Sequence, residues 1–101
     1  MDKPRVGLIT FGDERDDMWQ KVFKNLSEPR HAELREYLET LPIELYSNEE
    51  VARTRDQINS QADALSSARV DVLIVHTPCW TSPNLVVHGV QRLDLSLIHI
   101  S

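Results

Sequence analysis

The sequence is poor in the residues on which disulfide scaffolds and phosphate-binding loops depend. It has a single cysteine, Cys79, so no disulfide can form within the chain, and this suits a reducing compartment. Its three glycines are too scattered for the motifs G-x-G-x-x-G or G-x-x-x-x-G-K-[ST], which hold nucleotide phosphates. We therefore expect neither a disulfide-stapled fold nor a nucleotide-binding loop.

Positive charge and long apolar runs are also scarce. The formal net charge of −5 disfavours general nucleic-acid binding, because phosphate contacts need a basic surface. No stretch approaches the about 20 apolar residues of a membrane helix. The first five residues lack the basic and then apolar pattern of a signal peptide. We expect a cytoplasmic protein with no nucleic-acid and no membrane partner.

The chain does contain an alternation of strand-like and helix-like segments. Its 101 residues, 41% of them hydrophobic, suffice for one domain with a core but not for two. Short apolar, β-prone runs predict strands over 5–11, 43–46 and 70–76. Apolar residues at spacings of three and four predict helices over 18–41, 51–65 and 83–93. This order predicts the α/β class, with a three-layer, flavodoxin- or Rossmann-like parallel sheet truncated after about three βα units.

Capping residues predict where two of the helices begin. Ser27, followed by Pro29, predicts that the first helical stretch is interrupted and that a new helix starts there. Ser47 or Asn48 predicts the start of the next helix, and the two glutamates that follow suit its positive end.

The last seven residues, L-S-L-I-H-I-S, differ in character from the rest of the chain. They resemble the in-frame translation of a transposase adapter end used in preparing sequencing libraries. We therefore expect an amino-terminal α/β domain over 1–94 and a non-native, adapter-derived tail over 95–101, and we discount His99 as a site residue. The alternative is a native fourth strand, since the alternation is strand-like. Because the third strand would otherwise have an uncovered edge, we predict that Leu95–Ile100 lies beside it.

Two loops follow the carboxyl ends of the first and third predicted strands, where parallel sheets carry their ligand sites. In the loop from Gly12, the residues Asp13, Asp16 and Asp17 could hold Mg²⁺, as in a phosphorylatable receiver domain. Such a domain also needs an aspartate at the end of the third strand, where this chain has His76. A solvated, charged loop is therefore the preferred interpretation.

The third-strand loop contains candidates for metal binding and for nucleophilic catalysis. His76, Cys79 and His88 suggest a metal site, but structural or site-lining roles are commoner for single histidines, so we predict no metal site in this chain. Cys79 does not fit the phosphatase pattern, because Leu85 stands where an arginine is needed, and no histidine–acid pair is visible to activate the thiol. We therefore predict that Cys79 is not a nucleophile.

The motif T-P-C-W over 77–80 is the most unusual feature of the sequence. A tryptophan on a loop at the carboxyl end of a strand can stack on the apolar face of a sugar ring. The alternative is that Trp80 packs beneath its own loop.

The segments V-G-L-I-T-F-G-D-E-R, V-D-V-L-I-V-H and T-P-C-W resemble the amino-terminal domain of the L-fucose and L-arabinose isomerase family over roughly Arg5 to Leu93. The resemblance implies a fragment of a ketol-isomerase that interconverts aldose and ketose sugars. In this family a divalent ion, usually Mn²⁺, holds the sugar oxygens while a carboxylate moves a proton between C1 and C2. The metal ligands and these carboxylates belong to later domains, so the fragment alone is expected to be inactive.

The resemblance also implies site residues and partners. The family's amino-terminal domain contributes substrate contacts to the active site of a neighbouring subunit, which implies a homo-oligomer, a trimer or a hexamer, and a monosaccharide substrate. Trp80 would stack on the sugar, Arg15 would donate hydrogen bonds to its hydroxyls, and Asp13 could orient Arg15. The loop lacks the proline and second arginine of the L-fucose isomerase form, which leaves the sugar open. The alternative function is a stand-alone flavodoxin-like module that binds a small ligand or signals.

Overall fold

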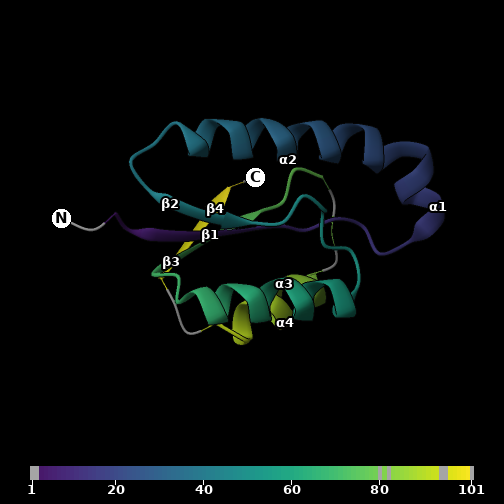
Figure 1. Ribbon diagram of the computed structural model, residues 1–101. Helices are drawn as coiled ribbons and strands as arrows, with labels where there is room; N and C mark the ends of the chain where they lie inside the picture. The colour runs from purple at the N-terminus through teal and green to yellow at the C-terminus, as the bar shows by residue number, and fades with distance from the viewer. Residues whose placement is uncertain (1–2, 80, 82, 94–95, 101) are drawn as a thin grey trace.

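Strands and helices alternate along the chain in a computed structural model, which describes residues 3–79, 81, 83–93 and 96–100 (Figure 1). The strands are β1 (Arg5–Thr10), β2 (Glu44–Ser47), β3 (Val72–His76) and β4 (Ser96–Ile100). The helices are α1 (Asp16–Met18), the π-helix η1 (Trp19–Phe23), α2 (Lys24–Glu39), α3 (Arg55–Ala68) and α4 (Pro83–Gln91).

The four strands form one parallel sheet in the order β2-β1-β3-β4. From β1 the chain passes to one neighbour, β2, and then crosses back to β3 on the other side of β1. The strand order therefore reverses between β1 and β3. At this reversal the last residues of the two strands, Thr10 and His76, are register partners.

Helices cover both faces of the sheet. Figure 1 shows α2 over one face, and α3 and α4 over the other. Because side chains alternate along a strand, β1 contributes to both cores. Leu8 packs with Leu38 of α2, whereas Ile9 packs in the cluster that holds Ile58 of α3 and Leu85 of α4. The predicted α/β class, with a three-layer, flavodoxin- or Rossmann-like parallel sheet, is confirmed.

The predicted interruption at Ser27 and Pro29 is wrong. Helix α2 runs through both residues, and the irregular turn lies earlier, in η1. Pro29 removes one backbone N–H, so the carbonyl of Asn25 loses its helical partner, but both residues are exposed and water can replace that bond. No helix of the described part, α2 included, combines the length and apolar character needed to cross a bilayer.

The predicted helix start at Ser47 or Asn48 is also wrong. Ser47 ends β2, and the Asn48 side chain closes a turn by accepting a hydrogen bond from the backbone N–H of Glu50 at 2.9 Å. Helix α3 begins seven positions further on than Asn48, at Arg55, where Thr54 and Gln57 form a capping box. The sequence contains two adequate caps in this region, and the one that also has a glutamine three residues later starts the helix.

The predicted position of the carboxyl-terminal segment is confirmed for its described residues. Strand β4 pairs in parallel with β3 from Val72 opposite Ser96 to His76 opposite Ile100. Leu95, which the prediction included, lies outside the described residues. The adapter origin of residues 95–101 stays a prediction.

The capping box gives a test of why α3 begins where it does. We expect Thr54→Ala to lower the free energy of unfolding by about 1 kcal/mol, because the backbone N–H of Gln57 loses its acceptor. Thr54→Ser keeps the hydroxyl and should lie close to the parent chain. Urea denaturation followed by circular dichroism measures both variants, and an equal loss in the two would contradict the capping role.

Candidate functional site

The carboxyl ends of β1 and β3 form the candidate site. Ligands of open parallel sheets bind where the strand order reverses, in the crevice outside the carboxyl ends of the strands. The loop after β1 and the loop after β3 meet there, since the Thr81 hydroxyl donates a hydrogen bond to the carbonyl of Gly12 at 3.0 Å. The two loops singled out from the sequence are thus brought together.

Asp13 and Arg15 form a tightly bonded pair in the first of these loops. Asp13 Oδ1 accepts from the backbone N–H of Arg15 at 2.9 Å and from its Nε at 3.0 Å, and Asp13 Oδ2 accepts from Nη2 at 2.7 Å. The Asp13 side chain is 0% exposed, whereas that of Arg15 is 53% exposed. These hydrogen bonds lower the pKa of Asp13, although burial opposes them. Asp13 is therefore a buried anion beneath a half-exposed cation.

The preferred interpretation of a solvated loop is therefore wrong for Asp13. A buried carboxylate is stable only with partners, and the neighbouring arginine supplies them within the same loop. Asp16 differs, because its side chain is 89% exposed. The contact between Asp13 and Arg15 that the family resemblance implied is present, whereas their role toward a substrate stays a prediction.

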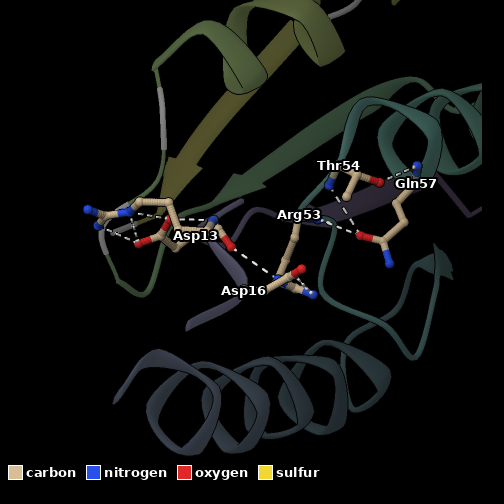
Figure 2. A network of polar contacts seen from close by, with 6 residues as sticks. Asp13, Asp16, Arg53, Thr54 and Gln57 are labelled. Carbon is tan, nitrogen blue, oxygen red and sulfur yellow. Dashed lines mark hydrogen bonds and ion pairs between the residues drawn. The ribbon is translucent and has the colours of Figure 1, made fainter. Parts of the chain in front are cut away.

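Arg53 also contacts the loop that follows β1. Its Nη1 donates to the carbonyl of Asp13 at 3.4 Å and to Asp16 Oδ1 at 3.2 Å, the contacts seen in Figure 2. The guanidinium also lies 4.8 Å from the ring centroid of Trp19, which η1 places in the core. A Cβ at Gly12 would lie 2.9 Å from both the Trp19 ring and the Val51 side chain, so a side chain there would force at least one neighbour to move. Sequence reasoning missed Arg53, for which no local motif gives a signal.

A chain of buried polar groups runs beneath the loops. The Thr10 hydroxyl lies 2.6 Å from Nδ1 of His31 and 3.1 Å from Nδ1 of His76. His31 Nε2 in turn lies 2.7 Å from the carbonyl of Asn48. Thr10 and His31 were not predicted as site residues, since the former ends a strand and the latter lies in α2.

The two histidines in this buried chain of groups are held in their neutral form. Burial lowers the pKa of His76 to about 4, with further lowering by the nearby His31 and Arg30. Burial and the charge of Arg35 lower the pKa of His31, although its hydrogen bond to Asn48 opposes them. Desolvation disfavours the imidazolium in both cases.

The other sequence candidates are not assembled into a metal centre. His88 bonds to Asn59 of α3, with Nε2 2.7 Å from Oδ1, and Cys79 is a half-buried free thiol. Among the described residues no three histidine, cysteine or acidic side chains are grouped so that they could hold a metal ion. Trp80 lies outside the described residues, and its role stays a prediction.

Comparisons of this chain with protein-family models, with curated proteins and with solved structures found no match. The functional interpretation therefore depends on the residues and on the geometry of the two loops.

The buried histidines predict a marked sensitivity to acid. A histidine whose folded pKa lies below its ordinary value of 6.5 takes up its proton mainly in the unfolded state. The stability present above pH 6.5 should thus decline as the pH falls toward about 4, by roughly 1–3 kcal/mol for His76. Urea unfolding at a series of pH values measures this decline.

One histidine variant makes that measurement specific. In His76→Asn the decline should shrink, because the buried imidazole is gone. A His76→Asn profile that matches the parent would contradict the assignment.

Proposed function

We propose that this chain supplies sugar contacts to an aldose–ketose isomerase of the L-fucose and L-arabinose type. The observation that carries the proposal is the guanidinium of Arg15, which the buried Asp13 holds at the carboxyl end of β1. The resemblance of the sequence to that family supplies the reaction class. The geometry at the carboxyl ends of β1 and β3, which we call the rim, is compatible with it.

A guanidinium held in this way suits a sugar for two reasons. Arginine carries only N–H donors in a fixed plane, so it complements the oxygen atoms of a polyhydroxylated ligand. Asp13 binds Nε and Nη2 and so fixes the orientation of that plane. Because the side chain is already ordered, a ligand loses less free energy to immobilising it on binding.

The chemical step lies outside this chain in the proposal. The described residues do not offer the ligand set that Mn²⁺ would need. The ion and the carboxylate that moves the proton would therefore come from the later domains that the family resemblance implies. This chain would bind and orient the monosaccharide, with Trp80 stacking on the ring as the resemblance implies.

Replacing Arg15 tests the proposal directly. We expect the ¹⁵N-labelled chain to bind L-fucose or L-arabinose with shifts of the backbone amides of residues 12–15, measured by NMR titration. Arg15→Ala should weaken that binding about tenfold or more, because hydrogen bonds to a charged donor are lost. Trp80→Ala should weaken it as well.

A control variant is available ahead of β1, at the opposite edge of the sheet. Lys3 is exposed, so Lys3→Ala removes one positive charge far from the carboxyl ends of the strands. Equal affinities of Arg15→Ala and the parent chain would contradict the sugar contact. Binding of inorganic phosphate at the rim, with no response to either sugar, would favour the stand-alone small-ligand module instead.

A further inference from the structure

We propose that His76 is a second hydrogen-bonding residue of this site, held as a neutral imidazole whose Nε2 accepts a hydrogen bond from a sugar hydroxyl. The inference rests on the proposed sugar-binding function and adds a residue that neither the sequence motifs nor the family resemblance singled out as a sugar contact. It follows from the order of donors and acceptors in the buried chain formed by His31, Thr10 and His76, which we call the histidine relay.

The carbonyl of Asn48 fixes the first member of the histidine relay. A carbonyl oxygen can only accept, so the 2.7 Å contact requires a proton on Nε2 of His31. In the neutral ring Nδ1 then carries the lone pair. At 2.6 Å from that nitrogen, the Thr10 hydroxyl must be the donor.

Thr10 passes this direction on to His76. A hydroxyl has one proton, and Thr10 donates it in the hydrogen bond to His31. The Thr10 oxygen is therefore the acceptor in the contact with His76. The 3.1 Å contact therefore places a proton on Nδ1 of His76. In the neutral ring Nε2 of His76 is left with a lone pair, as an acceptor and not a donor.

The location of this lone pair points to a ligand. Thr10 and His76 are the last residues of β1 and β3 and face each other where the strand order reverses. His76 is 5% exposed, and the loop that follows it is tied to Gly12 through Thr81. Among the described residues, none bonds to Nε2 of His76, since the contact of this ring with Thr10 is made by Nδ1. The lone pair on Nε2 therefore has no partner within the described part of the protein.

The acceptor on His76 complements the donors of Arg15. A sugar hydroxyl can donate and accept at once, so it can satisfy both kinds of group, whereas an ionised carboxylate has no proton to give to a lone pair. The low pKa of His76 keeps the lone pair available at neutral pH. A site with one fixed cation and one fixed acceptor thus favours uncharged polyhydroxylated ligands over ionised carboxylates.

The protonation pattern can be read in the unmodified chain. Long-range ¹H–¹⁵N correlation spectra of histidine-labelled protein at pH 7 should show the Nε2–H form of His31 and the Nδ1–H form of His76. Addition of L-fucose or L-arabinose should shift the Nε2 resonance of His76 and leave His88, which bonds to Asn59, unchanged. The opposite tautomer of His76 in the free protein would overturn the inference.

Responses at two positions separate this inference from the proposed function. A sugar that shifts the amide of Arg15 but leaves His76 Nε2 unmoved overturns the His76 contact alone. If neither sugar shifts either position, the proposed function fails and the contact fails with it.

Variants of Thr10 test the histidine relay itself. Thr10→Val removes the hydroxyl with little change in volume, so His76 should lose its fixed tautomer and sugar affinity should fall about tenfold, the loss of one hydrogen bond. Thr10→Ser should restore both properties. Unchanged affinity in a folded Thr10→Val chain contradicts the inference, and if that variant does not fold, the tautomer measurement on the unmodified chain still decides.

Discussion

The parallel pairing of β1 with β3 is the constraint on which the rest of this structure depends. It places Thr10 opposite His76 and brings the loop after β1 beside the loop after β3. Residues 66 positions apart in the sequence therefore share one hydrogen bond at the rim of the sheet. The two cores hold this pairing from both faces, because consecutive residues of β1 point toward α2 and toward α3 with α4. The site thus follows from the sheet rather than from any single loop.

The fold could be predicted from the sequence to the extent that its signals are local. Runs of apolar, β-prone residues predicted the strands, and the alternation of strands with helices predicted the parallel sheet. Helix boundaries were harder to predict because local signals compete. Asn48 and Thr54 are both good caps, and only the added glutamine at position 57 favours the second. Pro29 favoured a break in the helix. The hydrogen bond that it removes lies on the exposed side of α2, however, so the helix continues through it.

The candidate site was foreseen only where its members are close in sequence. Asp13 and Arg15 are two residues apart, and the family resemblance implied their contact before the structure placed them together. Arg53 and His31 reach the same region from other elements, through contacts that no spacing in the sequence encodes. The burial of Asp13 was missed for the same reason, since its loop looks charged and solvated until the packing of the surrounding segments is known.

The ion pair of Asp13 and Arg15 has a structural origin that strengthens its proposed role in binding. A fully buried carboxylate needs partners whether or not a ligand is present, because an unpaired buried charge would strongly destabilise the fold. Folding therefore sets the position of the guanidinium before any sugar arrives. The same holds for His76, whose tautomer is set by Thr10 and, through His31, by a backbone carbonyl. A ligand that meets donors and acceptors already oriented for stability loses little entropy in ordering them. Stability and the proposed recognition at this site thus depend on the same contacts, and a substitution that weakens one is expected to weaken the other.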